Sequence, residues 1–88
     1  MANYKLVFRR SVYKDLKPIP KADVKRILAR INALAIDPRA KGCEKLSGQE
    51  RYRVRQGVYR IIYEIVDDTL IITVVKIGHR REVYERTR

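Results

Sequence analysis

Residues 51–66 read RYRVRQGVYRIIYEIV, and this stretch decides the fold. Polar and apolar residues follow strand-like patterns on both sides of a glutamine–glycine pair, which predicts two strands joined by a tight turn. If residues 56–57 form a two-residue turn, Arg53 lies directly opposite Arg60. Residues opposed across antiparallel strands share a face of the sheet, so Arg53, Arg55 and Arg60 are expected on one side.

Such a cluster of like charges needs a reason, because opposed like charges destabilise a sheet. A fold that keeps them is expected to use them to hold an anion. The planar fork of arginine binds phosphate through two hydrogen bonds, which the point charge of lysine does not. From residue 45 to residue 88 the chain carries eight arginines and two lysines, a bias that indicates phosphate recognition.

Length and composition predict a single domain spanning residues 1–88, with room for one modest core. The formal net charge of +11 favours a polyanionic partner such as nucleic acid or an acidic protein. Membrane insertion is not expected, because no apolar run approaches the roughly 20 residues of a spanning helix. Cys43 is the only cysteine and is expected to be unreactive, which fits a cytoplasmic protein.

Upstream of residue 51 the pattern predicts a strand over residues 4–8 and a short helix capped by Ser11. A longer amphipathic helix begins at Lys21 and ends before the Asp–Pro pair at residues 37–38, since the residue before proline avoids helical angles. Its apolar stripe consists of Val24, Ile27, Leu28, Ile31, Leu34 and Ala35.

A loop over residues 38–49 leads into three strands, expected at 51–55, 58–66 and 69–77. A second two-residue turn at residues 67–68 would place Arg60 opposite Val75. The fold class is therefore α+β: strand, helix, helix and a three-stranded antiparallel meander, followed by a short C-terminal segment. Both helices are expected on one face of a small twisted sheet, with the arginine cluster on the other face.

Four motifs in order give the chain a family resemblance. They are Lys45-Leu46-Ser47-Gly48, Tyr52-Arg53-Val54-Arg55, Tyr59-Arg60-Ile61-Ile62-Tyr63 and Gly78-His79-Arg80-Arg81-Glu82-Val83-Tyr84. With them the chain resembles the RelE-type toxins of the RelE/ParE toxin–antitoxin superfamily, over nearly its whole length.

The resemblance implies an endoribonuclease, an mRNA interferase that cuts messenger RNA in the ribosomal A site without a metal or other cofactor. The 2′-hydroxyl attacks the adjacent 3′-phosphate and leaves a 2′,3′-cyclic phosphate and a 5′-hydroxyl. The implied partners are mRNA on the ribosome, ribosomal RNA and a cognate antitoxin, acidic and RelB-like. That antitoxin would lay helices in a groove or add a strand to an exposed sheet edge, either the strand at 4–8 or the one at 51–55.

Three residues match the family's catalytic positions. Arg60 would bind the phosphate, Arg80 would act on the leaving group, and Tyr84 would stack on a base or steer the 2′-hydroxyl, unless its ring only packs the chain end. Arg53 and Arg55 depart from relatives that carry lysines there, one of them a proposed general base. Guanidinium is effectively never deprotonated, so an arginine can hold phosphate but is a poor proton acceptor.

His79 is the candidate base by chemistry, because histidine is the residue type whose ordinary pKa lies nearest neutrality. The alternatives are Tyr84, a ribosomal group or a nearby glutamate, although Glu64 is expected to neutralise arginines on its own face. Further phosphate contacts are expected from Arg51, Lys45 and Arg81.

Three other functions fit the same sequence. ParE-type toxins share the fold but lack the nuclease residues and poison DNA gyrase. The presence of Arg60, Arg80 and Tyr84 favours the nuclease. A basic RNA- or ribosome-binding module without catalysis, or a ribosome-associated factor that is not a toxin, would also explain the charge.

Overall fold

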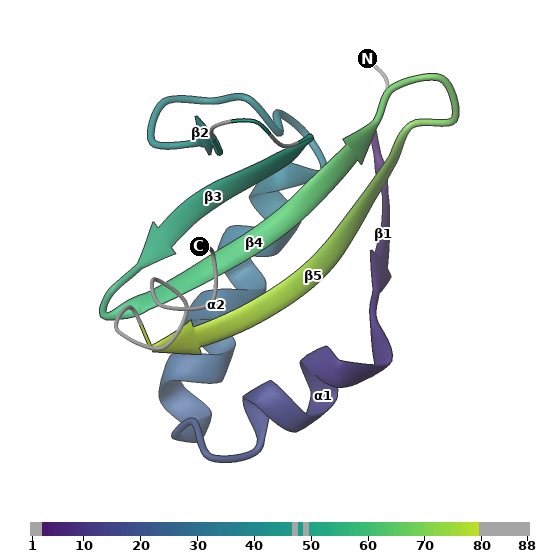
Figure 1. Ribbon diagram of the computed structural model, residues 1–88. Coiled ribbons are helices and arrows are strands. Elements are labelled where there is room, and N and C mark those ends of the chain that lie inside the picture. The colour runs from purple at the N-terminus through teal and green to yellow at the C-terminus, as the bar shows by residue number, and fades with distance from the viewer. Residues whose placement is uncertain (1–2, 47, 49, 80–88) are drawn as a thin grey trace.

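The computed structural model describes residues 3–46, 48 and 50–79, and it shows a five-stranded mixed sheet with two helices (Figure 1). The strand order in the sheet is β1-β5-β4-β3-β2. The predicted α+β order is confirmed, and β2 is a short strand inside the expected loop. The elements are β1 (Lys5–Phe8), α1 (Arg10–Leu16), α2 (Lys21–Leu34), β2 (Glu44–Lys45), β3 (Arg51–Gln56), β4 (Tyr59–Val66) and β5 (Ile71–His79).

Both helices cover the same face of the sheet, as predicted. Figure 1 shows α2 behind β3, β4 and β5, with α1 near the end of β1. The stripe of α2 buries Ile27 and Ile31 completely, and α1 adds Val12 to the same core. The prediction for Ser11 was wrong: it lies inside α1, and Arg9 occupies the N-cap position without a side-chain hydrogen bond.

The core on the helix side contains a buried tyrosine at its centre. Tyr63 is fully buried and its hydroxyl donates to the carbonyl oxygen of Pro38 at 2.6 Å, just beyond the end of α2. Burial raises the pKa of Tyr63 far above its usual range. Tyr52 stacks on it, so both tyrosines point towards the helices. The buried core residues are Val12, Ile27, Ile31, Leu34, Val54, Ile61, Tyr63, Ile72, Val74 and Ile77.

The first strand and the first helix share the outer edge of β5. Strand β1 runs parallel to the first half of β5, from the Lys5–Ile71 pair to the Phe8–Val74 pair. Helix α1 then follows the second half, where the Asp15 carboxylate accepts the Ile77 backbone N–H at 3.1 Å and pairs with Lys76 Nζ at 2.9 Å. The Asp15 side chain of α1 therefore accepts a backbone hydrogen bond from the part of the β5 edge that β1 does not cover.

The first hairpin turns one residue later than predicted. Gln56 pairs with Tyr59, so the two loop residues are Gly57 and Val58, and Arg60 lies opposite Arg55 instead of Arg53. Gly57 has a φ of 61°. Glycine at the first loop position with a positive φ is what a type II′ turn requires. The register moved by two positions in total, so each arginine kept its face.

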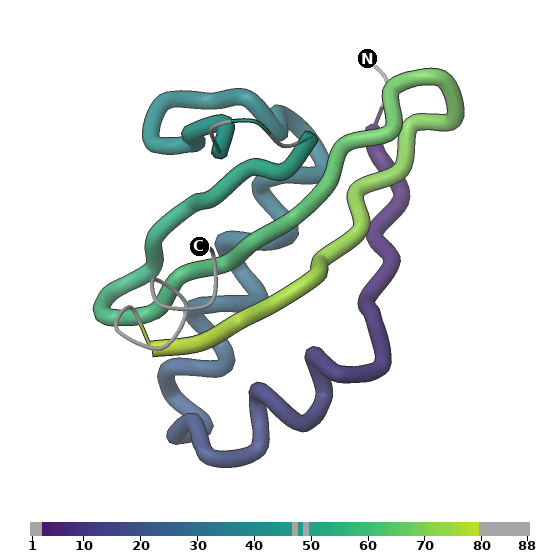
Figure 2. The backbone as a smooth tube through the Cα atoms, in the orientation of Figure 1, coloured from purple at the N-terminus to yellow at the C-terminus, as the bar shows by residue number. Residues whose placement is uncertain are grey.

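The second hairpin differs more from the prediction. Val66 pairs with Ile71, so the loop has four residues, and Leu70 adopts a φ of 54°. The register then shifts between Ile62 and Tyr63 through a β-bulge in the pairing with β5. As a result Arg60 lies opposite Gly78 and not opposite Val75. Figure 2 shows the two turns at opposite ends of β4.

The edges of the sheet are β1 and β2. The expectation that the strand at residues 4–8 forms an exposed edge is confirmed. The alternative edge, β3, is partly covered, because β2 pairs with Tyr52 and Arg53.

Candidate phosphate-binding face

The face of β3, β4 and β5 turned away from α1 and α2 carries the arginines, and we call it the open face. Strand pairing assigns residues to it directly, because paired residues share a side. Arg55 pairs with Arg60 and Arg53 pairs with Ile62, so the three predicted arginines do lie together on this face. Its residues on β3 and β4 are Arg51, Arg53, Arg55, Arg60, Ile62 and Glu64.

Arg60 lies on the central strand β4, at the end of this face next to the β3–β4 turn, in a buried position. Only 8% of it is exposed, and it is the one buried charged residue in the described part of the chain. Arg55 lies opposite on β3 and is exposed, while Gly78 lies opposite on β5 and adds no side chain. Guanidiniums on two adjacent strands can both donate to one phosphate. This end of the open face therefore suits a phosphate that spans Arg55 and Arg60.

The other end of the open face is balanced by carboxylates. Arg51 Nε donates to Glu64 Oε2 at 2.9 Å, and Arg9 Nη2 lies 3.9 Å from the same oxygen. Arg53 pairs with Glu44 of β2. The expectation that Glu64 neutralises neighbouring arginines is confirmed. Arg55, by contrast, makes no side-chain ion pair or hydrogen bond with any residue in the described ranges.

The bulge in β5 decides which of its side chains join the open face. Lys76 pairs with Ile62 and Gly78 with Arg60, whereas Ile77 pairs with Ile61 in the core. Without the extra residue, Ile77 would have turned towards Arg60. Lys76 is therefore a cation on this face that the sequence pattern did not indicate, and Asp15 holds it at 2.9 Å.

Two predicted site residues lie on the helix side by register. His79 pairs with Tyr59, whose ring packs against the core, and the two ring centroids are 6.2 Å apart. Lys45 pairs with Tyr52, and its Nζ lies 3.6 Å from Glu50 Oε2. Neither is brought together with Arg60. Three further candidates lie outside the described residues: Arg80, Arg81 and Tyr84.

A second cluster, at the β4–β5 turn, escaped the sequence reasoning. Arg39 Nη2 donates to Asp67 Oδ2 at 2.9 Å, and the Tyr4 hydroxyl donates to Asp67 Oδ1 at 2.8 Å. The hydrogen bond from Arg39, followed by that from Tyr4, holds the pKa of Asp67 below its ordinary value of 3.8. The guanidinium of Arg39 also lies 5.4 Å from the ring centroid of Tyr52. No local sequence signal joins these residues, because they come from four separate segments.

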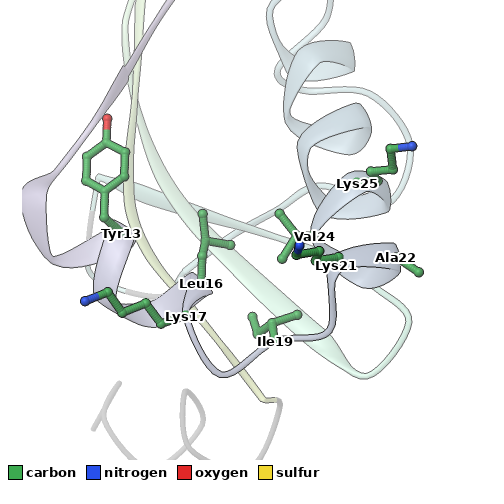
Figure 3. Close-up of a pocket in the computed structure, with 8 residues that line it drawn as sticks. All are labelled: Tyr13, Leu16, Lys17, Ile19, Lys21, Ala22, Val24 and Lys25. Atoms are coloured by element: carbon green, nitrogen blue, oxygen red, sulfur yellow. The ribbon is translucent and has the colours of Figure 1, made fainter.

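An apolar groove lies between α1 and the start of α2 (Figure 3). Its volume is about 750 Å³, and Figure 3 shows Leu16, Ile19 and Val24 lining its floor. Lysines surround these side chains, and 60% of Tyr13 is exposed. The lining residues are Tyr13, Leu16, Lys17, Ile19, Lys21, Ala22, Val24 and Lys25. Apolar floor and cationic rim together suit an acidic amphipathic partner. Among the described residues no helix is long and apolar enough to cross a membrane.

Comparison with known protein families shows which family the chain belongs to. Residues 6–84 match the family described as the ParE toxin of the type II toxin–antitoxin system parDE. The chain belongs to the RelE/ParE superfamily of toxins. It is also 33% identical over 86 residues to toxin RelE3 of Methanocaldococcus jannaschii, covering 92% of this chain and 96% of the relative. The predicted RelE resemblance is confirmed.

Solved RelE structures share the fold. The archaeal RelE–RelB complex from Pyrococcus horikoshii OT3 matches with a TM-score of 0.77 and 32% identity, over 89% of this chain and 96% of that one. The RelB–RelE antitoxin–toxin complex from Methanococcus jannaschii matches with a TM-score of 0.72 and 30% identity, over 93% and 99%. This RelE-type toxin therefore has the sheet and helices of its superfamily.

Proposed function

We propose that this toxin is a metal-independent endoribonuclease, an mRNA interferase that cuts messenger RNA in the ribosomal A site. The observation that carries the proposal is the buried Arg60 on the central strand β4, with Arg55 directly opposite on the open face. Paired guanidiniums beside a glycine suit the crowded, doubly charged phosphorane of RNA cleavage better than they suit a structural role. A toxin acting on ribosomes would work in the cytoplasm.

The chemistry needs an in-line displacement at phosphorus. The 2′-oxygen forms a bond to the adjacent phosphorus as its proton leaves, and the bond from phosphorus to the 5′-oxygen breaks as that oxygen gains a proton. The products are a 2′,3′-cyclic phosphate and a 5′-hydroxyl. Arg60 and Arg55 would stabilise the charge on the non-bridging oxygens, which develops in the transition state.

The remaining roles are assigned by resemblance. Arg80 would stabilise the leaving oxygen, and Tyr84 would orient the 2′-hydroxyl or stack on a base. Arg53, Arg51 and Arg81 would contact flanking phosphates, as would Lys45 if RNA reaches around β2. His79 stays a candidate for the base, but its register position beside Tyr59 favours a ribosomal group or Tyr84 instead.

The proposed protein partner is an acidic RelB-like antitoxin. RelE proteins 30% and 32% identical to this chain were solved as complexes with RelB. The groove between α1 and α2 would accept an amphipathic helix of that antitoxin, with its acidic side chains against Lys17, Lys21 and Lys25. The outer edge of β1 could accept an added strand. The lysines left exposed would contact ribosomal RNA through phosphates.

A second candidate function is poisoning of DNA gyrase, which the match to the ParE family favours. In that case the open face would be a docking surface and not a nuclease site. A basic RNA- or ribosome-binding module without catalysis is the third candidate.

Cleavage of a defined mRNA on programmed ribosomes tests the proposal. Wild type should give position-specific cuts with cyclic phosphate ends, and Arg60→Ala and Arg80→Ala should lose them. Absence of cleavage by wild-type protein, with and without ribosomes, would contradict the proposal. Inhibition of gyrase supercoiling by the same preparation would then support the ParE-type function.

A further inference from the structure

A cavity at the outer edge of β3 lies next to the open face, and three arginines line it. Its volume is about 310 Å³, and it is lined by Arg30, Gly42, Glu44, Arg53 and Arg55. Only one carboxylate faces three guanidiniums, and Glu44 already pairs with Arg53. The cavity therefore has an excess of positive charge that its own walls do not balance.

Arg30 reaches this cavity from α2, on the other side of the sheet. Strand β2 pairs with β3 at Tyr52 and Arg53 only, so no described strand covers the edge of β3 beyond that point. Arg30 comes to this uncovered edge. Its Nε is buried and has no hydrogen-bond acceptor among the residues that the structure describes. A buried donor without an acceptor is costly, and an incoming anion would remove that cost.

Gly42 leaves the space that the guanidinium of Arg30 occupies. A Cβ at this position would lie 3.1 Å from Arg30 Nη2, and the φ of 97° suits glycine alone. The loop between α2 and β2 thus approaches Arg30 closely without enclosing it. The side chain stays in reach of a ligand that enters beside Arg55.

We propose that Arg30, Arg53 and Arg55 bind a phosphate of single-stranded RNA adjacent to the phosphate held by Arg60. The inference deepens the proposed function and rests on it for the identity of the RNA strand. Arg55 belongs to both places, because it lines the cavity and pairs with Arg60. An RNA strand that crosses the open face from β5 to β3 passes Gly78, Arg60 and Arg55 and then reaches the cavity. The pairing of β3, β4 and β5 fixes that order.

The test compares Arg30→Gln with a matched control, Arg26→Gln. Both arginines lie on α2, but Arg26 is exposed and pairs with Asp23 at 3.2 Å. The probe is a fluorescein-labelled single-stranded RNA with 2′-O-methyl groups throughout, which the protein cannot cut. Anisotropy titrations at several salt concentrations give the dissociation constant and its salt dependence.

Arg30→Gln should weaken binding roughly 5–10-fold and lower the slope of log affinity against log salt by about 0.7, the value for one phosphate of a single strand. Arg26→Gln should change the affinity less than about twofold. Arg30→Lys should recover part of the loss, because it restores the charge without the fork. Melting temperatures of the variants confirm that each is folded.

Equal affinities for Arg30→Gln and Arg26→Gln would overturn the inference, as would the absence of any RNA binding by wild type. Loss of antitoxin binding in Arg30→Gln with unchanged RNA binding would also overturn it and make the cavity a carboxylate site. Cleavage on ribosomes is scored separately. If Arg30→Gln loses RNA affinity but wild type cuts no RNA, the phosphate site in the cavity is supported and the nuclease function is contradicted. If Arg30→Gln keeps its affinity and wild type cuts normally, the nuclease function is supported and the phosphate site in the cavity is contradicted.

Discussion

The two ends of the open face carry arginines in opposite electrostatic surroundings. At one end Arg51 is held by Glu64 at 2.9 Å, and Arg53 is paired with Glu44. At the other end the exposed Arg55 pairs with no carboxylate among the described residues, and it lies opposite the buried Arg60. Arg51 and Arg55 are the same residue type, so the neighbouring carboxylates make the difference. Arg51 and Arg53 already have a partner within the protein, whereas Arg55 can bind an external anion without losing one.

Replacement of Arg60 by alanine tests this comparison most strongly. We expect cleavage on programmed ribosomes to fall ~10²–10³-fold, because a donor aimed at developing charge in a buried site is lost. Single-turnover rates measure the effect. Arg60→Lys, which keeps the charge but loses the fork, should recover only part of the rate. Wild-type rates in a folded Arg60→Ala protein would mean that the end of the open face with Arg55 and Arg60 is not the reactive end.

The pair Arg55→Ala and Arg51→Ala separates the two ends directly. Loss of Arg55 should lower the cleavage rate roughly 10-fold, since it removes a charge-assisted hydrogen bond to the phosphate. Loss of Arg51 should lower the rate only about twofold, because Glu64 already holds its guanidinium and its contact to a flanking phosphate adds little. Equal losses in both variants would show that the whole open face binds RNA. In that case the pairing of Arg51 with Glu64 would not limit its part in RNA binding.

Acidification should weaken the balanced end, where Asp67 follows the last residue of β4. Hydrogen bonds from Arg39 and Tyr4 lower the pKa of Asp67. A carboxyl whose pKa is lower in the folded state stabilises the protein above its ordinary value of 3.8, and that contribution is lost as pH falls through the folded value. The free energy of unfolding should therefore drop between pH 5 and pH 2 more in wild type than in Asp67→Asn.

Urea titrations at each pH measure this difference. Asp68→Asn is the matched control, since it is the neighbouring exposed carboxylate and forms no ion pair with the described residues. Its pH dependence should follow that of wild type. A steep acid loss that persists in Asp67→Asn would place the sensitive carboxylate elsewhere.

The smallest expected effect concerns His79, which lies at the same end of the sheet as Arg55 and Arg60 but on the helix side by register. Replacing it by alanine should keep the cleavage rate within about threefold of wild type, because its ring lies against Tyr59 and away from Arg60. Rates across pH 5–9 provide the measurement. A loss of 100-fold, with the acidic limb of the pH profile removed, would instead make His79 the general base.

The errors in the predicted register have identifiable causes. Gly57 was placed second in its turn, whereas the type II′ conformation needs glycine first, a signal that the sequence did contain. The four-residue loop with Leu70 at a positive φ carried no such signal. The bulge opposite Ile62 could not be predicted either. It is set by the packing of Ile77 against the core, and no residue beside it in the sequence indicates it.

By itself the sequence determined the elements and the face that each side chain takes. Helix and strand periods are local, so the apolar stripe of α2 and the shared face of Arg53, Arg55 and Arg60 could be predicted. The register between β3 and β4 shifted by an even number of residues, which kept the arginines on their predicted face.

The tertiary structure alone decided which charges meet. It brought Glu64 to Arg51, Asp67 to Arg39, Asp15 to Lys76 and Arg30 to the edge of β3. These pairs join residues between 13 and 61 positions apart, a separation at which no periodicity operates. Long-range pairing, through the turns and one bulge, thus set which arginines meet a carboxylate of the described residues and which, like Arg55, do not.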